Sequence, residues 1–445
     1  MYGGDEVCAV VVDVGADTTK AGYAGEDSPK TVFSSAVGVL AGEDGGKQYT
    51  VDELHAPKPG LDVVSPYTDG VITSWDGYEQ VRTHEAGHAR ALTAAAAQIW
   101  AHALTRRLRI TSMEHPLMIA EPLTTTRQAR EKLVELIFEK HAPPALFLAK
   151  NSVLSSFAVG RPTSLVIDCS ASGTTVSAVH DGYALTKAMH RSPLGGAALT
   201  DLMLRTLGTN GVDVRPRYSF KRVATASGDF NVTPVNTPGV TASFALHKRW
   251  EIAADIKESC CRLLDTTFHE QEATAAPSAP YELPDGKPIE VGVERYKLPE
   301  LLFNPSLLGS FPSGMDVSPG TAGSLVAELG AASAAGTLKG IPAAVLDVVN
   351  RCDVDIRREM FGGVVLTGAG SLFPNLKERL ERELGEAAPA TVKLKVLASA
   401  SMPERKYSVW LGGSILASLG SFQQLWMSKA EYEEHGAAYI NKKCP

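Results

Sequence analysis

The stretch AVVVDVGADTTKAGYAG, residues Ala9–Gly25, decides the fold of this chain. An apolar, β-branched run ends at Asp13, small residues follow, and Thr19 stands six positions after the aspartate. This pattern predicts two strands joined by a short turn. A second copy, LVIDCSASGTTVSAVHDGY at Leu165–Tyr183, also has a strand that ends in Asp, small residues and a threonine six positions later, Thr174. Two such copies far apart in the chain predict a duplicated domain with a site between its halves.

Short β-branched runs alternate with amphipathic stretches along the rest of the chain, which is typical of an α/β protein. The expected strands are Ala9–Val14, Leu117–Ala120, Ser164–Asp168, Val176–His180 and Gly363–Thr367. The expected helices are Thr126–Glu139, Leu199–Leu207, Glu251–Leu264, Asn375–Glu383 and Gly413–Leu419. Three segments depart from the alternation and are interpreted as insertions. Arg82–Arg106 is rich in Ala and His and is expected to be helical, Ser227–Gly239 has little apolar periodicity, and Ser310–Gly340 is expected to form a loose surface loop.

Composition limits the classes of function. The 445 residues are 44% hydrophobic and 21% charged, as expected for two soluble domains. No apolar run is long enough for a membrane span and no secretion signal opens the chain, so neither a membrane nor secretion is expected. The six cysteines form no Cys-x-x-Cys pair, which suits a reducing compartment. A net charge of −7, with one modest basic cluster at Arg215–Arg222, argues against strong direct DNA binding.

The two strand–turn–strand copies are candidates for a phosphate site. Turns rich in backbone N–H groups bind phosphate oxygens, and the first turn, with Gly15, is followed by the cation of Lys20. Asp13 and Asp168, at matching strand ends, are expected to hold the waters of a Mg²⁺ ion. The same pattern also fits polar turns between core strands, in which the aspartates accept hydrogen bonds from the loop.

A third element makes the nucleotide interpretation more specific. VVLTGAGSLFPNLKERLEREL, residues Val364–Leu384, reads as a buried strand, a Gly-rich turn and an amphipathic helix, and such a turn admits a nucleotide close to the backbone. With the three elements in this order, the chain resembles actin and the actin-related proteins. The resemblance is carried by KAGYAGEDSPKTVF (Lys20–Phe33), GVITSWDGYE (Gly70–Glu79), TTTRQAREKLVELIFE (Thr124–Glu139), YELPDGKPIEVGVER (Tyr281–Arg295), RCDVDIRREMFGGVVLTGAG (Arg351–Gly370) and ERKYSVWLGGSILASLGSFQQLW (Glu404–Trp426).

Within that family the chain is most similar to the nuclear actin-related proteins of class four, in a plant-like form. RPRYSFKR (Arg215–Arg222) and the tail SKAEYEEHGAAYINKKCP carry this closer likeness. The resemblance implies the two-lobed fold that actin shares with heat-shock chaperones and sugar kinases, with ATP and Mg²⁺ or Ca²⁺ in a cleft between duplicated lobes. It places residues 1–158 and 408–445 in the first lobe, with an insertion near 82–106. Residues 159–407 form the second, with insertions near 227–239 and 310–340.

Family roles carry over where residues match. Asp13 and Asp168 would sit behind the metal waters and Lys20 would face the phosphates. Lys257 and Glu258 match the pair that contacts the nucleoside in this family. The adenine-side contacts match Gly368, Phe373 and Lys406.

The departures from actin point to weak ATPase activity and no filaments. Asn151 and Thr175 stand where actin positions its attacking water with Gln and His, and a shorter amide and a poor base predict slow or absent hydrolysis. Asp17 replaces a glycine beside the phosphates, where its charge is unfavourable. The loop by which actin docks into the next subunit is replaced by VGVLAGEDGGKQYTV (Val37–Val51). A cytoskeletal, filament-forming actin-like ATPase is the alternative. An active sugar kinase or chaperone ATPase would need a catalytic carboxylate in the cleft or a peptide-binding domain, and the sequence indicates neither.

The resemblance also implies partners. A groove that receives amphipathic helices in this family is matched by Phe157, Gly160, Leu416, Leu419 and Leu425, although the same residues also fit simple core packing. Its class implies a helix from a chromatin-remodelling ATPase or acetyltransferase scaffold, shared with monomeric actin, and histones as further partners. The expected localisation is nuclear, with some protein in the cytoplasm.

One motif does not fit this interpretation. HEAGH, residues His84–His88, has the spacing of a zinc peptidase. It lies in an insertion with no evident third ligand, which argues against peptidase chemistry and leaves incidental metal binding open.

Overall fold

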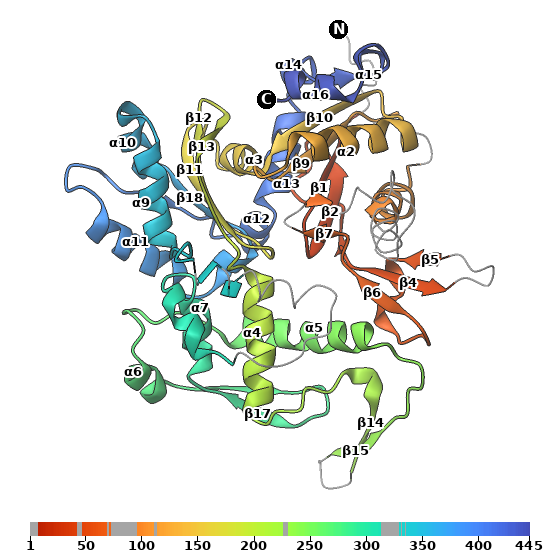
Figure 1. The fold of residues 1–445 in the computed structure, drawn as a ribbon, viewed down its shortest axis with the longest axis vertical. Coiled ribbons are helices and arrows are strands. Elements are labelled where there is room, and N and C mark those ends of the chain that lie inside the picture. Colours follow the sequence, from red (N-terminus) through yellow and green to blue (C-terminus); the bar gives the residue numbers. More distant parts are fainter. Residues whose placement is uncertain are drawn as a thin grey trace.

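Two β-sheets, each with helices packed against it, form the framework of the molecule (Figure 1). The computed structural model describes residues 8–41, 47–68, 71–72, 96–110, 114–225, 230–312, 329–330, 332–333 and 335–445. The sheet of the first lobe runs β20 (Met427–Ser428), β10 (Ala145–Lys150), β9 (Leu117–Glu121), β1 (Val10–Val14), β2 (Thr18–Tyr23) and β3 (Thr31–Ser34). The sheet of the second lobe runs β13 (Tyr183–Ser192), β12 (Thr174–His180), β11 (Ser164–Cys169), β18 (Val364–Thr367) and β19 (Val396–Leu397).

The internal repeat in the sequence corresponds to equivalent hairpins in the two sheets. β1 pairs antiparallel with β2 and parallel with β9, and β11 pairs antiparallel with β12 and parallel with β18. Asp13 lies opposite Lys20, and Asp168 lies opposite Thr175. All five predicted strands are present, and the predicted two-lobed α/β fold is confirmed.

Smaller sheets and helices complete the lobes. The smaller strands are β4 (Val37–Ala41), β5 (Lys47–Thr50), β6 (Asp62–Val64), β7 (Tyr67–Thr68), β8 (Val71–Ile72), β14 (Phe220–Ala224), β15 (Phe230–Pro234), β16 (Ala279–Glu282) and β17 (Pro288–Val291). The helices are α2 (Arg127–Lys140), α3 (Asn151–Ala158), α4 (Gly196–Thr209), α5 (Ala242–Cys260), α6 (Glu270–Ala275), α7 (Glu294–Glu300), α9 (Ile341–Arg351), α10 (Val354–Gly362), α11 (Leu376–Ala387), α12 (Met402–Lys406), α13 (Ser408–Ala417), α14 (Gly420–Gln423), α15 (Lys429–His435) and α16 (Ile440–Lys443). Single turns of 3₁₀-helix occupy Asp52–His55, Arg217–Ser219, Pro305–Ser310, Ala369–Leu372 and Ala437–Tyr439, and a π-helix occupies His102–Arg107.

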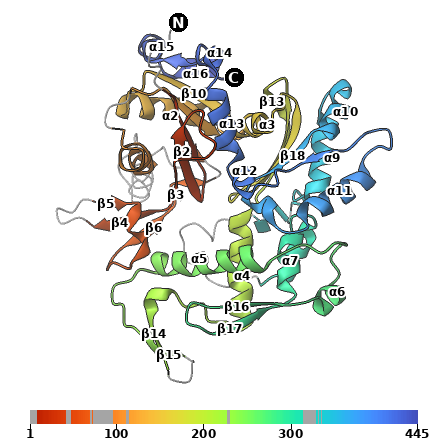
Figure 2. The same ribbon diagram turned by 180° about the vertical axis from the view of Figure 1, so that it is seen from behind.

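The lobes are joined where α3 and α13 pack together, in the upper half of both views (Figures 1 and 2). A Cβ on Gly412 would come within 1.8 Å of the carbonyl oxygen of Leu154, so only glycine permits this approach. The Ser408 hydroxyl lies 3.2 Å from that of Ser155 and also bonds the hydroxyl of Thr367 at the end of β18. A residue of α3 and a residue of the second sheet therefore meet at the first residue of α13.

The lobes also meet where α5 passes β6. The Thr241 hydroxyl caps α5 by accepting the N–H of Phe244 and donates to the carbonyl of Leu61 at 2.5 Å. Ser243 donates to the Asp62 carboxylate at 2.8 Å, and its oxygen accepts the N–H of Val63 at 3.1 Å. α5 therefore begins at Ala242 and not at the predicted Glu251, because contacts with the other lobe fix its first turn.

Other predicted boundaries also differ. α5 ends at Cys260, before the predicted Leu264, because Cys261 has an extended backbone, and α13 begins at Ser408, ahead of the predicted Gly413. The segment 227–239 contains β15, which pairs with β14 in an exposed hairpin; a strand solvated on both faces needs no apolar alternation.

The remaining insertions are only partly described. In the segment 82–106, residues 96–101 are helical and lead into the π-helix, as predicted, and residues 82–95 lie outside the described residues. In 310–340, Leu329 is fully buried in the core of the second lobe, so this segment is anchored and is not wholly a loose loop. A search of the described helices found none with the length and apolarity that a membrane span requires.

Candidate nucleotide-binding site

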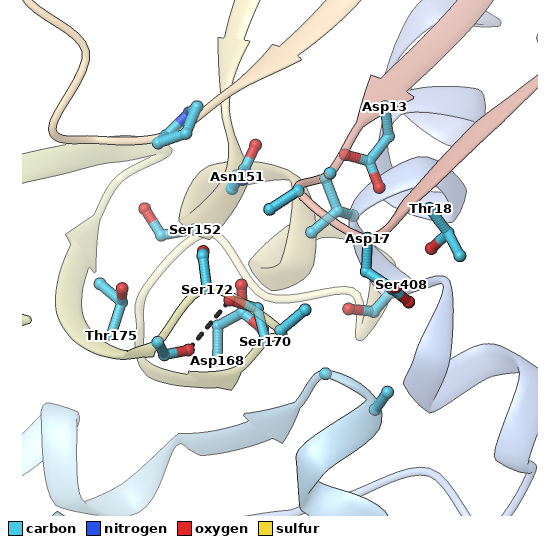
Figure 3. Close-up of a pocket in the computed structure, with 18 of the residues that line it drawn as sticks. Asp13, Asp17, Thr18, Asn151, Ser152, Asp168, Ser170, Ser172, Thr175 and Ser408 are labelled. Atoms are coloured by element: carbon cyan, nitrogen blue, oxygen red, sulfur yellow. Dashed lines mark hydrogen bonds between the residues drawn. The ribbon is translucent and has the colours of Figure 1, made fainter. Parts of the chain in front are cut away.

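A cleft opens where the turns of the two equivalent hairpins face each other (Figure 3). Its lining comes from both lobes and from the α3–α13 crossing. The lining residues are Asp13, Val14, Gly15, Ala16, Asp17, Thr18, Lys20, Pro122, Leu123, Thr124, Asn151, Ser152, Val166, Asp168, Ser170, Ala171, Ser172, Gly173, Thr175, Ser177, Arg191, Glu258, Gly368, Ala369, Lys406, Ser408 and Val409. The predicted Asp13, Gly15, Lys20, Asp168, Glu258, Gly368 and Lys406 are therefore brought together at one cleft.

The turn of the first hairpin is tight and cross-linked. The N–H of Gly15 donates to the carbonyl of Thr18 at 3.0 Å, and a Cβ on Gly15 would approach that oxygen to 2.9 Å. The Ser35 hydroxyl donates to the carbonyl of Gly15 at 2.7 Å. The Lys20 ammonium lies 3.0 Å from the Asp13 carboxylate and donates to the Thr18 carbonyl at 3.2 Å. The cation and the carboxylate predicted for phosphate and metal are therefore held side by side.

The turn of the second hairpin is held against the start of α4. Both the N–H and the hydroxyl of Ser170 donate to the carbonyl of Gly173, at 3.0 and 2.9 Å. The N–H of Gly196 donates to the carbonyl of Ser170 at 3.0 Å. A Cβ on Gly195 would lie 2.3 Å from the backbone nitrogen of Gly173. Close backbone packing thus fixes this turn.

The electrostatics of the cleft favour a cation near Asp168. Burial and, to a lesser extent, the nearby charge of Asp13 raise the pKa of Asp168 from 3.8 to about 6, and Lys20 partly opposes the shift. One lysine does not offset two carboxylates in this enclosed space. A divalent cation between the two carboxylates would turn their repulsion into attraction to the ion. Two carboxylates suit a divalent cation that keeps several of its bound waters.

Gly368 permits the third element to close the cleft. Its φ is +86°, and a Cβ there would lie 2.5 Å from both the Asp168 carboxylate and the carbonyl of Cys169. The adjoining turn, Ala369–Leu372, follows β18 as the Gly-rich sequence predicted. Glu258 and Lys406 line the same cleft with exposed side chains.

Two predicted nucleotide contacts lie away from the surface of the cleft. The Lys257 ammonium is buried and donates to the carbonyl of Gly196 at 3.0 Å and to the Thr200 hydroxyl at 2.8 Å. Burial lowers its pKa, while Glu258 and Asp17 oppose the shift. Phe373 packs in the core of the second lobe and is only 8% exposed. Neither lines the cleft, so their nucleotide contacts stay predictions, and Lys257 would have to give up existing hydrogen bonds to reach a ligand.

The residues that stand where actin positions its water do face the cleft. Asn151 and Thr175 both line it, together with Asp17 (Figure 3). The sequence analysis missed Ser152, whose buried hydroxyl has no hydrogen-bond partner among the described residues, as is true of the Asn151 amide oxygen. The sequence signal that could have revealed Ser152 is its position at the start of a helix that directly follows the strand β10.

The predicted partner groove is only partly accessible. Leu419 and Leu425 are 47% and 54% exposed, Gly160 is exposed, and Phe157 is partly buried. Leu416 is 5% exposed and packs in the core shared by the two crossing helices. The burial of Leu416 fits the core-packing alternative, whereas Leu419 and Leu425 expose apolar surface, and the partner groove stays a prediction.

No metal site made of protein side chains alone is found among the described residues, which hold no cluster of three or more His, Cys, Asp or Glu. The HEAGH sequence at 84–88 lies outside them. Asp13 and Asp168 would hold a divalent ion through waters together with phosphate oxygens. The narrow turns, the carboxylate pair and the unpaired polar atoms of the α3 start all fit a cation-bound nucleotide.

Comparisons with known proteins agree with this geometry. A family model for actin matches residues 4–445. Actin-related protein 4 of Oryza sativa is 47% identical over 476 residues, and that of Arabidopsis thaliana is 44% identical over 473, both over the full length of each chain. Actin-related protein 4 of Schizosaccharomyces pombe is 33% identical over 458 residues, covering all of this chain and 99% of the relative. The chain therefore belongs to the actin family, and within it is similar to the actin-related protein 4 group over its whole length.

Proposed function

We propose that the chain is an ATP-binding, non-filamentous subunit of nuclear chromatin-remodelling and histone-acetyltransferase complexes, with ATP as a structural ligand. One observation carries the nucleotide part of this proposal. Asp13 and Asp168, from equivalent hairpins of the two lobes, line one cleft, where burial and the charge of Asp13 together raise the pKa of Asp168. A cation and a polyanion placed there would join the two lobes through both turns.

The bound nucleotide is ATP with Mg²⁺ or Ca²⁺. The ion would sit behind waters held by Asp13 and Asp168, and Lys20 would face the phosphates. Such an ion supplies charge neutralisation between the carboxylates and the phosphate oxygens.

Hydrolysis is slow or absent because Asn151 and Thr175, which stand where actin positions its attacking water, are poorly suited to place and activate it. Thr175 offers a hydroxyl, and the Asn151 side chain is one methylene shorter than glutamine. Misplacing a reacting water by about an ångström costs on the order of a hundredfold in rate. ATP is then retained as a cofactor of folding and assembly.

The chain acts as a single subunit and not as a filament. In place of a docking loop, β4 and β5 form a hairpin packed on β6, which is already committed to the first turn of α5. The alternative, a cytoskeletal ATPase, would require that this surface bind the next subunit.

The proposed partners are a helix of a remodelling ATPase or an acetyltransferase scaffold and a molecule of monomeric actin, with histones as further ligands. The exposed Leu419 and Leu425 support docking of a helix beside α13, since exposed leucines on one edge are typical anchors for an amphipathic helix. Through these complexes the chain would contribute to chromatin organisation and transcription regulation, in the nucleus with some protein in the cytoplasm.

Two measurements test the proposal. Equilibrium titration of the purified chain with Mg·ATP should show tight binding that Asp13→Asn abolishes and Asp181→Asn, a control at the exposed far end of the second hairpin, leaves unchanged. Quantitative mass spectrometry of the tagged protein from its own cells should recover remodeller or acetyltransferase subunits together with actin. Recovery of filament-binding proteins, or assembly of ATP-dependent polymers, would refute the proposal.

A further inference from the structure

Ser152 carries a buried hydroxyl that the fold does not use. The residue is 7% exposed, it lines the nucleotide cleft, and its oxygen has no hydrogen-bond partner among the residues that the structure describes. Burying a hydroxyl without a partner is unfavourable. A buried, unpaired donor that faces a cleft points to a ligand.

The backbone around Ser152 adds a second donor set. Ser152 is the second residue of α3, whose N-terminus follows β10 directly and whose N-cap residue, Lys150, makes no side-chain cap. The Lys150 ammonium instead lies 2.7 Å from the Glu121 carboxylate. The first N–H groups of a helix have no partner within the helix and carry a partial positive charge, so this end of α3 suits an anion.

The neighbouring side chain supports the same site. The amide oxygen of Asn151, the first residue of α3, is also buried without a partner in the described structure. Both side chains lie beside the facing turns that carry Asp17 and Ser172 (Figure 3). A ligand with both donor and acceptor groups, such as a hydrated or protonated oxyanion, would satisfy the two side chains together.

We infer that Ser152 and the N-terminus of α3 bind a tetrahedral oxyanion: the terminal phosphate of ATP or a free phosphate beside ADP. The inference rests on the proposed function for its nucleotide and deepens it by assigning a phosphate-binding residue. Asp13 and Asp168 line the same cleft and repel an anion, so binding requires a divalent cation between them and the phosphate.

The test uses the full chain, first loaded with Mg·ADP and then titrated with inorganic phosphate, while the release of a fluorescent ADP is followed. Phosphate should slow release, and Ser152→Ala should raise the phosphate concentration required about tenfold, the loss expected for one hydrogen bond to a charged group. Ser155→Ala is the matched control, because Ser155 is a buried serine of the same helix whose hydroxyl faces Ser408 and not the cleft. Ser152→Cys keeps the volume with a weaker donor and should show the same loss if the alanine variant fails to fold.

The outcomes separate this inference from the proposed function. A loss of affinity for ATP but not for ADP in the Ser152 variants identifies the terminal phosphate as the ligand, and a loss for phosphate added to ADP identifies the free ion. Unchanged affinity for ATP and phosphate overturns the inference and leaves nucleotide binding intact. If ADP does not bind at all, the proposed function fails. Inorganic phosphate is then titrated with Mg²⁺ into the nucleotide-free protein, and the stability of the wild type is compared with that of the Ser152 variants. Greater stabilisation of the wild type supports the oxyanion site alone, and equal stabilisation of the variants overturns it.

Discussion

Replacing Asp168 by Asn should stabilise the nucleotide-free protein and weaken its binding of Mg·ATP. Burial and the charge of Asp13 raise the pKa of Asp168 to about 6, whereas the ordinary value is 3.8. The difference is roughly two units, and each unit corresponds to about 1.4 kcal/mol. Keeping this carboxylate charged in the empty cleft therefore costs up to about 3 kcal/mol of folding free energy at neutral pH.

The pH dependence has a defined sign. Between about pH 4 and pH 6 the folded protein holds a proton on Asp168 that the unfolded chain has released, so stability falls as the pH rises through this window. The full cost is present above about pH 6. Asn cannot be charged, so the variant should exceed the wild type in stability by up to about 3 kcal/mol at pH 7.5 and by little near pH 4.

Urea unfolding of protein stripped of metal and nucleotide, at pH 4.5 and pH 7.5, measures the effect. Asp181→Asn, which removes an exposed charge from the same hairpin, should change stability by less than about 0.5 kcal/mol. Titration with Mg·ATP should show the opposite ranking, with Asp168→Asn the weakest binder. A wild type as stable as the variant at pH 7.5, or a variant that binds Mg·ATP equally well, would refute the idea that this carboxylate is held charged for a cation.

Three further predictions concern the cleft and the predicted partner groove. Gly368→Ala would place a Cβ 2.5 Å from the Asp168 carboxylate at a φ of +86°, and should cost about 2–4 kcal/mol in urea unfolding and abolish ATP binding. Asn151→Gln with Thr175→His should raise single-turnover phosphate release tenfold to a hundredfold, on the order expected for repositioning a water; an unchanged rate would mean that water placement does not limit hydrolysis. Leu425→Ser, at a residue 54% exposed, should leave the unfolding free energy within about 0.5 kcal/mol and reduce recovery of partner subunits; full recovery would exclude this residue from the interface.

The parts of this molecule that the sequence predicted are those that local patterns determine. The strand, aspartate and turn of each hairpin depend on residues within about ten positions, so the β1–β2 and β11–β12 pairs and their Asp13 and Asp168 were found correctly. The Gly-rich turn that contains Gly368 was also predicted from local sequence, and the structure adds that its backbone closely approaches the Asp168 carboxylate.

The parts that sequence reasoning misplaced depend on distant contacts. The start of α5 is fixed by the hydrogen bond from Thr241 to Leu61 in the other lobe, which no local pattern contains. The hydrogen bond from the Lys257 ammonium to the Thr200 hydroxyl on α4 also joins residues far apart in the sequence, and the nucleoside contact that the family resemblance gives to Lys257 stays a prediction. Ser152 was missed because an unpaired hydroxyl cannot be recognised until every neighbour has been placed.

The way in which the lobes are joined supports a structural role for the nucleotide. Among the residues that the structure describes, connections come from hydroxyl groups around Ser408 at the α3–α13 crossing and from Thr241 with Ser243 at the start of α5. The cleft would add another, but without a cation its two carboxylates oppose each other, and burial together with the charge of Asp13 raises the pKa of Asp168 to about 6. Binding a cation with ATP would turn that repulsion into attraction, and any ligand that binds only the folded state stabilises it. Because hydrolysis would remove a phosphate from this connection, slow turnover is what a subunit held together by its nucleotide requires.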